Sequence, residues 1–97
     1  MENNQNERLH AFVQGSVQGV GFRFFVYQTG SNLQLHGWVR NRINGNVEIL
    51  TEGSREKLNT LLRETRKGPQ IAQIVKVDFE WQKSRNDLPP FTILQTK

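Results

Sequence analysis

The sequence contains no cysteine, which excludes disulfide bonds and thiolate metal sites. This absence fits a reducing compartment, so we predict a cytoplasmic protein. No stretch reaches the roughly 20 apolar residues that a membrane-spanning helix needs. Residues 1–7, MENNQNE, lack the basic and apolar parts of a signal peptide. We therefore expect a disordered polar tail at 1–7, followed by a single domain at 8–97.

Carboxylates are absent from a long part of the chain, between Glu7 and Glu48. An even spread of the acidic residues would place about four in that window. The window instead contains several arginines, namely Arg8, Arg23, Arg40 and Arg42. Together with the formal net charge of +4, this local excess of positive charge suggests an anionic partner.

Hydrophobic spacing predicts an alternation of strands and helices. The expected elements are a strand at 8–15, a helix of about three turns from 22, a hairpin at 37–50, a helix capped by Ser54 and ended by KGP at 67–69, a strand at 75–81 and a short strand at 91–94. The apolar face of the fourth strand is formed by Val75, Val77, Phe79 and Trp81. Two helices on one face of an antiparallel sheet bury this pattern compactly. We therefore predict an α+β, ferredoxin-like βαββαβ sandwich with a short extra C-terminal strand.

The register of the hairpin decides where Asn41 points. A two-residue turn would place arginines in the apolar row of the hairpin. A three-residue loop at 43–45, with its glycine in the left-handed conformation, instead pairs Asn41 with Val47 and Arg40 with Glu48. We predict this second register, which leaves Asn41 on the core-facing side at the end of its strand.

A glycine-rich loop, GSVQGVG at 15–21, joins the first strand to the first helix. It is not a Walker loop, because no Gly-Lys-Ser/Thr follows, and it is not a dinucleotide fingerprint, because Phe24 replaces the third glycine. The loop can still form a concave nest of amides for an anion. Arg23 lies at the positive end of the helix dipole, and a bound anion would offset that mismatch. An ordinary tight turn with a solvated arginine is the alternative.

Several short motifs resemble the acylphosphatase family in their order and spacing. They are GSVQGVGFR at 15–23, GWVRN at 37–41, VE at 47–48, EG at 52–53 and KGP at 67–69. The resemblance extends from about residue 8 to the end of the chain. It implies a ferredoxin-like fold and hydrolysis of the carboxyl-phosphate bond of small acyl phosphates, which gives a carboxylate and inorganic phosphate.

The resemblance also implies roles for individual residues. Arg23 would be the catalytic arginine that binds phosphate, and Asn41 would position the attacking water. The phosphate oxygens would be surrounded by amides of Val17, Gln18, Gly19, Val20, Gly21 and Phe22. The substrate phosphate itself would assist removal of the proton from water. The implied partners are a small acyl phosphate and inorganic phosphate, and we expect a monomer that binds neither membrane nor nucleic acid.

The chemistry of the reaction agrees with what the sequence offers. Phosphoryl transfer needs positioning and charge stabilisation, and a weakly basic carboxylate leaves without a general acid. We therefore expect neither a metal nor another cofactor. His10 and His36 are expected to be surface or hydrogen-bonded residues rather than ligands.

Two positions depart from the pattern of the family. Gly30 stands where the family usually has alanine, and Gln34 stands where it has a glycine. A glycine inside a helix costs up to about 1 kcal/mol relative to alanine. The glutamine removes the expected left-handed terminator of the helix. We expect both changes to weaken the helix without affecting the chemistry.

An RNA-binding module on the same topology is the main alternative, because GFRFFVY at 21–27 resembles the RNP1 motif. RNP1 belongs on the third strand, however, and this run follows a glycine loop and starts a helix. The third strand here, VEILTE at 47–52, contains no aromatic residue. A catalytically silent ligand-sensing domain on the same fold is a further alternative.

Overall fold

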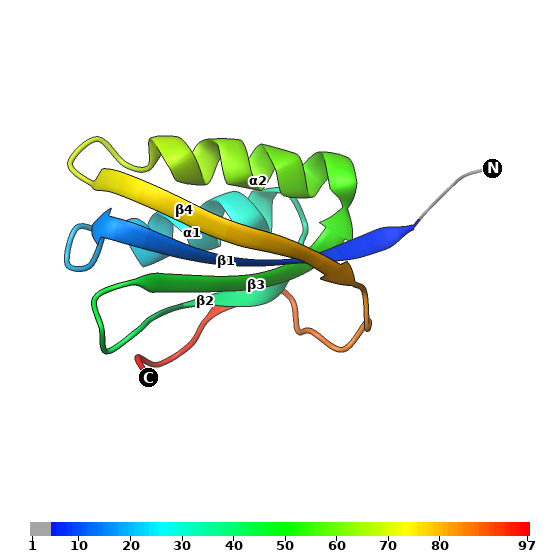
Figure 1. Cartoon of the computed structure of the whole chain (residues 1–97). Coiled ribbons are helices and arrows are strands. Elements are labelled where there is room, and N and C mark those ends of the chain that lie inside the picture. Colours follow the sequence, from blue (N-terminus) through cyan, green and yellow to red (C-terminus); the bar gives the residue numbers. More distant parts are fainter. Residues whose placement is uncertain (1–4) are drawn as a thin grey trace.

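The computed structural model describes residues 5–97 and shows one five-stranded sheet with two helices on the same face (Figure 1). The elements are β1 (Asn6–Ser16), α1 (Phe22–Asn32), β2 (His36–Asn41), β3 (Val47–Ser54), α2 (Arg55–Lys67), β4 (Gln73–Lys83) and β5 (Thr92–Ile93). The strand order is β4-β1-β3-β2-β5. The predicted ferredoxin-like βαββαβ sandwich with an extra C-terminal strand is confirmed. The sheet is mixed, because β5 runs parallel to β2.

The first strand begins at Asn6, two residues before the predicted start of the domain at residue 8. Asn6 pairs with Ser54, and Glu7 pairs with both Gly53 and Lys83. Residues 1–4 of the predicted tail lie outside the described residues.

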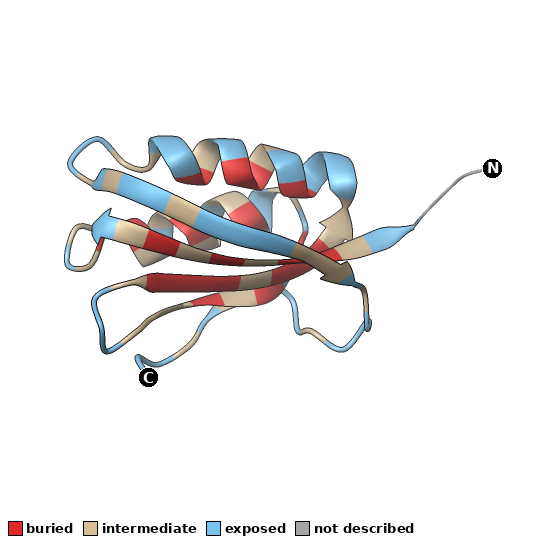
Figure 2. Cartoon of the chain, in the orientation of Figure 1, coloured by how far each residue is buried: buried red, intermediate tan, exposed pale blue. Residues whose placement is uncertain are grey.

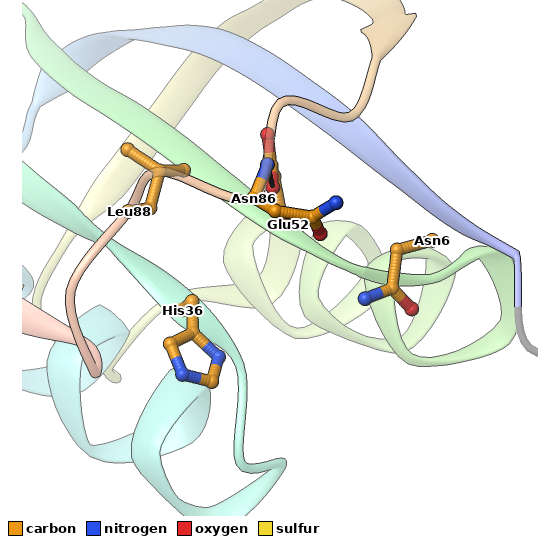
Figure 3. Close-up of a pocket in the computed structure, with 5 residues that line it drawn as sticks. All are labelled: Asn6, His36, Glu52, Asn86 and Leu88. Atoms are coloured by element: carbon orange, nitrogen blue, oxygen red, sulfur yellow. Dashed lines mark hydrogen bonds between the residues drawn. The ribbon is translucent and has the colours of Figure 1, made fainter.

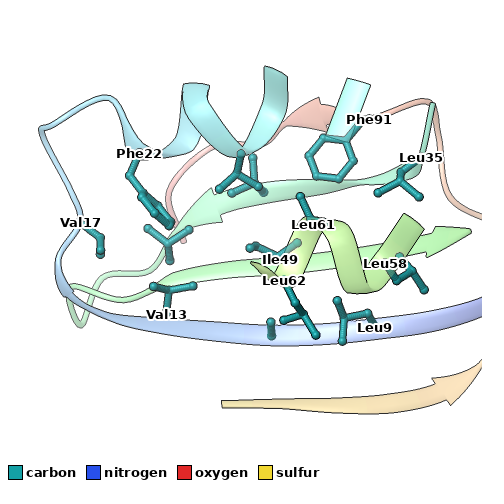
Figure 4. Close-up of a cluster of buried hydrophobic side chains, with 14 residues drawn as sticks. Leu9, Val13, Val17, Phe22, Leu35, Ile49, Leu58, Leu61, Leu62 and Phe91 are labelled. Atoms are coloured by element: carbon teal, nitrogen blue, oxygen red, sulfur yellow. The ribbon is translucent and has the colours of Figure 1, made fainter. Parts of the chain in front are cut away.

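The hydrophobic core lies between the two helices and the face of the sheet that they cover (Figures 2 and 4). Side chains alternate across a strand, so β1 buries Leu9, Ala11 and Val13 on this face. Helix α2 buries one stripe at the spacing of a helical turn, formed by Leu58, Leu61, Leu62 and Thr65. The hydroxyl of Ser54 accepts a hydrogen bond from the Lys57 amide and caps this helix, as predicted.

The β2–β3 hairpin has the predicted register. Asn41 pairs with Val47 and Arg40 pairs with Glu48, around a loop in which Gly45 has a φ of 97°. The Arg42 amide donates to the Asn46 carbonyl at 2.8 Å and closes the three-residue loop. Asn41 therefore lies on the same side of β2 as the buried Val39.

Gly30 provides space for an aromatic ring. A Cβ atom at this position would lie 2.6 Å from the Cδ2 atom of Phe91, which is buried against α1. The cost of a glycine inside the helix is therefore offset by the close packing of the segment that leads into β5. The departure from the family pattern at residue 30 has a packing explanation.

The prediction that α1 lacks a left-handed terminator is wrong. Gln34 itself has a φ of 60°. The amide of Leu35 donates to the Gly30 carbonyl at 3.0 Å, and the amide of Gln34 donates to the Ser31 carbonyl at 2.9 Å. These two hydrogen bonds form a Schellman motif, so the helix still ends in the usual left-handed geometry. Because Gln34 has a Cβ atom, it is strained in this conformation.

The prediction that Val75 belongs to the apolar face of β4 is wrong. The pairing with β1 shifts register between Gln14 and Gly15, so that Gly15 lies opposite Ile74, and Val75 is left 77% exposed. Ile74 packs against the core in its place. From Val77 onward the alternation follows the prediction, because Val77, Phe79 and Trp81 pair with buried residues of β1, although Phe79 on this edge strand stays 40% exposed.

A buried carboxylate holds the segment after β4. Glu52 is 4% exposed and accepts hydrogen bonds from the Arg8 guanidinium at 2.7 Å, from the Ser84 hydroxyl and from the amides of Arg85 and Asn86. Burial alone would raise the pKa of Glu52, but the Arg85 amide and the Arg8 guanidinium, with the other donors, lower it to about 2.

Replacing Gln34 by glycine is expected to raise the free energy of unfolding by about 1 kcal/mol, because glycine has no Cβ to strain the left-handed conformation. Urea denaturation measures the difference. Gln28→Gly is the control, since Gln28 is exposed within α1 and the same change there should lower the free energy of unfolding by about 1 kcal/mol. A Gln34→Gly protein as destabilised as this control would show that residue 34 carries no strain.

The low pKa of Glu52 makes its contribution to stability depend on pH. The folded-state pKa of about 2 lies below the usual value of 4.5, so the contribution is present above pH 4.5 and is lost as the pH falls toward 2. The shift corresponds to about 3 kcal/mol. Glu52→Gln is expected to lower the free energy of unfolding by about that amount at pH 7, with a difference from wild type that shrinks below pH 4.5.

Urea denaturation at successive pH values tests this expectation. Glu80→Gln is the control, because Glu80 is exposed on β4 and its replacement should change the free energy of unfolding by less than about 0.5 kcal/mol. A difference between Glu52→Gln and wild type that is the same at pH 7 and pH 2 would contradict the role of the charge.

Candidate active site

A pocket of about 180 Å³ lies where the β1–α1 loop, the end of β2 and β5 meet. In Figure 1 the β1–α1 loop and the β2–β3 turn lie at the same end of the sheet. The pocket is lined by Val17, Gly19, Gly21, Phe22, Arg23, Phe24, Asn41 and Ile93. It therefore brings together all of the predicted site residues except Gln18 and Val20.

The glycines of the loop are required by the backbone. Gly19 and Gly21 have φ angles of 79° and 78°, and a Cβ atom on either would meet open space. Their left-handed conformation, rather than crowding, thus favours glycine. Gly15, where the loop leaves β1, differs, because a Cβ there would lie 2.0 Å from the Gln73 carbonyl oxygen.

Helix α1 begins at this loop without a side-chain cap. Gly21 is the N-cap residue, and its carbonyl accepts from the Phe25 amide at 3.0 Å. The amides of residues 22–24 therefore have no acceptor inside the helix. Such amides, at the positive end of the helix dipole, are suited to an anion.

Arg23 lies in this first turn and lines the pocket. Within residues 5–97 its guanidinium forms no hydrogen bond or ion pair with another side chain, although the side chain is half-buried. By contrast, Arg8 pairs with Glu52, and Arg40 and Arg42 pair with Glu48. The charge of Arg23 is thus left available to a ligand.

Asn41 contributes the second polar side chain of the pocket. Its Oδ1 atom is buried and has no hydrogen-bond partner among the described residues. A buried polar atom without a partner costs about 1–3 kcal/mol, so such atoms usually mark a position for water or ligand. The backbone carbonyl of Asn41 accepts from the Lys97 amide at 3.1 Å, which holds the end of β2.

Gln18 and Val20 do not line the pocket. The side chain of Gln18 donates to the carbonyls of Arg42 and Asn46, at 2.8 and 2.9 Å. It therefore ties the glycine loop to the hairpin that carries Asn41. The side chain of Val20 packs against the core. Roles for the amides of these two residues stay predictions.

Phe24 and Ile93 are lining residues that the sequence prediction missed. Position 24 lies off the core stripe of Phe22 and Val26, so helical spacing could have identified Phe24 as an outward-facing residue beside Arg23. Ile93 reaches the pocket only because β5 pairs with β2, where Ile93 lies opposite Val39. No local pattern indicates that pairing.

Glu48 neutralises the other arginines near this end of the sheet. It is 8% exposed and contacts His10 at 2.6 Å, Arg40 at 3.1 Å and Arg42 at 3.3 Å. Burial opposes ionisation, but the hydrogen bonds from His10 and Arg40 keep the pKa of Glu48 below its usual value. The predicted pairing of Arg40 with Glu48 is confirmed, and His10 is hydrogen-bonded as expected. Glu48 does not line the pocket, so it is not placed to act as a base there.

A second hollow, of about 230 Å³, is lined by Asn6, His36, Glu52, Asn86 and Leu88 (Figure 3). Both oxygens of Glu52 are already hydrogen-bonded within the protein. The carboxylate of Glu52 in this hollow is therefore already bound within the protein and has a structural role.

Residues 5–97 contain neither a metal-binding cluster nor a membrane-spanning helix. No group of three or more His, Asp or Glu side chains in this part of the chain is arranged to hold a metal ion. No helix among the described elements is long and apolar enough to cross a membrane.

Comparison with known proteins identifies the family of the chain. The acylphosphatase family model matches residues 9–93. The acylphosphatase of Moorella thermoacetica is 44% identical over 80 residues, which cover 82% of this chain and 86% of that protein. The acylphosphatase of Koribacter versatilis is also 44% identical, over 88 residues that cover 91% of this chain and 80% of that protein.

A solved structure extends the similarity to the whole fold. The crystal structure of acylphosphatase from Bacillus subtilis has a TM-score of 0.87 at 33% sequence identity, and the match covers 91% of this chain and 98% of that chain. The RNA-binding alternative has no support, because most of the RNP1-like run at 21–27 lies in α1 rather than on a strand. The chain belongs to the acylphosphatase family.

Proposed function

We propose that the pocket between the β1–α1 loop and β2 is where this chain hydrolyses the carboxyl-phosphate bond of acyl phosphates, the reaction of its family. In this proposal the phosphate is bound by amides of residues 17–22 and by Arg23, and the attacking water is positioned by Asn41. One observation carries the proposal: the Arg23 guanidinium and the buried Asn41 Oδ1 atom, neither of which has a partner among residues 5–97, line the same small pocket.

The phosphate site follows from the start of α1. Amides without a helical acceptor and the positive end of the dipole attract the dianion. In an anion nest, left-handed residues between right-handed ones turn successive amides toward one side. The left-handed conformations of Gly19 and Gly21 fit that pattern. Arg23 adds a planar guanidinium that can donate two hydrogen bonds to phosphate oxygens. Charge that spreads over these oxygens in the transition state is stabilised by the same donors.

The water site follows from Asn41. Its Oδ1 atom can accept a hydrogen bond from water, and its amide group can donate one, so a single water can be oriented. The water oxygen attacks phosphorus as the bond between phosphorus and the bridging oxygen breaks. The electron pair of that bond leaves with the carboxylate, which needs no proton. The proton of the water passes to a phosphate oxygen of the substrate, so no protein base and no metal is needed.

The relative position of the two sites depends on Gln18. Its two hydrogen bonds to backbone carbonyls of the hairpin connect the phosphate loop to the strand that ends at Asn41. Positioned groups lose much of their effect when they are displaced by about 1 Å. The Gln18 contacts would thus keep the bound phosphorus and the attacking water at a constant separation.

The protein is further proposed to act as a cytoplasmic monomer without cofactors. The absence of cysteine fits a reducing compartment. Arg23, Asn41 and the glycine loop already lie at one pocket within a single copy, so a second copy is not needed to bring them together.

Arg23→Ala is expected to abolish measurable hydrolysis, because the main cation at the phosphate is removed. The loss of ultraviolet absorbance of benzoyl phosphate, with chelator present, measures turnover. Inorganic phosphate should raise the melting temperature of wild type by binding the folded state, and this increase should disappear in the variant. Arg63→Ala is the control, because Arg63 is exposed on α2 and should keep both activity and the phosphate effect. Full activity in Arg23→Ala would contradict the proposed site.

Asn41→Ala is expected to lower kcat by at least 10²-fold, the scale for one positioned polar group, with a much smaller change in KM. Steady-state kinetics on benzoyl phosphate give both constants. Asn46→Ala, in the same hairpin, is the control: the side chain removed is outside the pocket, and the Asn46 carbonyl that accepts from Gln18 is retained. Equal turnover in Asn41→Ala and wild type would refute the role of Asn41 in positioning water.

A further inference from the structure

Two large apolar side chains reach the pocket from elements that lie far apart in the sequence. Phe24, in the first turn of α1, is 57% exposed, and Ile93, in β5, is 37% exposed. Other exposed apolar residues of the described chain, such as Ile43 and Ile71, do not line this pocket. Single exposed apolar residues are normal on a protein surface, but two that line the same pocket as Arg23 and Asn41 can contact a substrate.

Phe24 has an aromatic neighbour, and strand pairing fixes the backbone of Ile93. The ring of Phe24 lies 6.0 Å from the ring of Tyr27, measured between centroids. Ile93 pairs with Val39, and the next residue, Leu94, donates its amide to the Val39 carbonyl at 3.0 Å. A contact surface that is ordered before binding loses less entropy when a ligand binds.

The charges around the pocket restrict the ligand further. Of the lining residues in 5–97, Arg23 is the only charged one, and the proposed function assigns its charge to the phosphate. Arg40 and Arg42 are paired with Glu48. An acyl group with its own carboxylate or phosphate would therefore find no second unpaired cation among the lining residues, whereas an apolar acyl group would bury surface against Phe24 and Ile93.

We propose that Phe24 and Ile93 form the binding site for the acyl group, and that the preferred substrates are acyl phosphates with an apolar, above all aromatic, acyl group. The inference rests on the proposed function, which places the phosphate at Arg23. The acyl group extends from the phosphate toward the opening of the pocket. There an aromatic acyl ring packs against the ring of Phe24 in an offset or edge arrangement.

The test compares two substrates that share the phosphate and differ in the acyl group. The ratio of kcat/KM for benzoyl phosphate to kcat/KM for acetyl phosphate is measured in wild type, Phe24→Ala and Ile93→Ala. The ratio in wild type is expected to be at least about 10, and each substitution should lower it about fivefold, mainly through a higher KM for benzoyl phosphate. Phe79→Ala and Ile71→Ala are the matched controls, because both residues are exposed outside the pocket and should leave the ratio unchanged.

Inhibition by inorganic phosphate provides a second readout. Phosphate has no acyl group, so its inhibition constant should change less than about twofold in Phe24→Ala and Ile93→Ala if these residues contact only the acyl group. A ratio near one in wild type, or a ratio that neither substitution lowers, would overturn the acyl site while leaving the phosphate site unaffected. Full activity in Arg23→Ala would instead refute the proposed function, and the acyl site with it.

Discussion

The pocket that contains Arg23 and Asn41 depends on one row of strand pairing. Val47 of β3 lies opposite Val13 of β1 on one side and opposite Asn41 of β2 on the other. Adjacent strands lie about 4.8 Å apart, so this row places Asn41 about 10 Å from Val13, two residues before the glycine loop begins at Gly15. A slip of one residue would turn Asn41 to the other face of the sheet. The complete burial of Val13 and Val47 opposes such a slip, because it would move their side chains out of the core.

The arginines of the first half differ in whether each has a carboxylate partner, and this matters more than their number. The long window without carboxylates leaves the first half rich in arginine, but most of these arginines are paired in the folded protein. Glu48 forms ion pairs with Arg40 and Arg42, and Glu52 forms an ion pair with Arg8. Arg23 stays without a partner among the described residues and lies where the helix dipole is also positive. In the proposed function, a bound phosphate would offset both positive features at once.

The energetic costs of Gly30 within α1 and of Gln34 just after it are offset by the contacts that each residue permits. Gly30 weakens the helix, yet it allows Phe91 to pack within van der Waals distance of the helix backbone. Gln34 is strained, yet it keeps the Schellman hydrogen bonds that direct the chain into β2. The sequence pattern identified both departures from the family. It could not indicate the compensation at Gly30, because Phe91 is remote in the chain, and it wrongly suggested that a left-handed terminator requires glycine.

The sequence by itself determined the elements, the hairpin register and the candidate pair of Arg23 and Asn41. These features rest on side-chain periodicity, on turn residues and on motifs, all of which are local in the chain. The tertiary structure decided what local patterns cannot express: the bulge that exposes Val75, the Gln18 side chain that spans 24 positions to the Arg42 carbonyl, and the placement of Ile93 in the pocket. Each of these depends on which strands become neighbours in the sheet, and that is settled only when the core is packed.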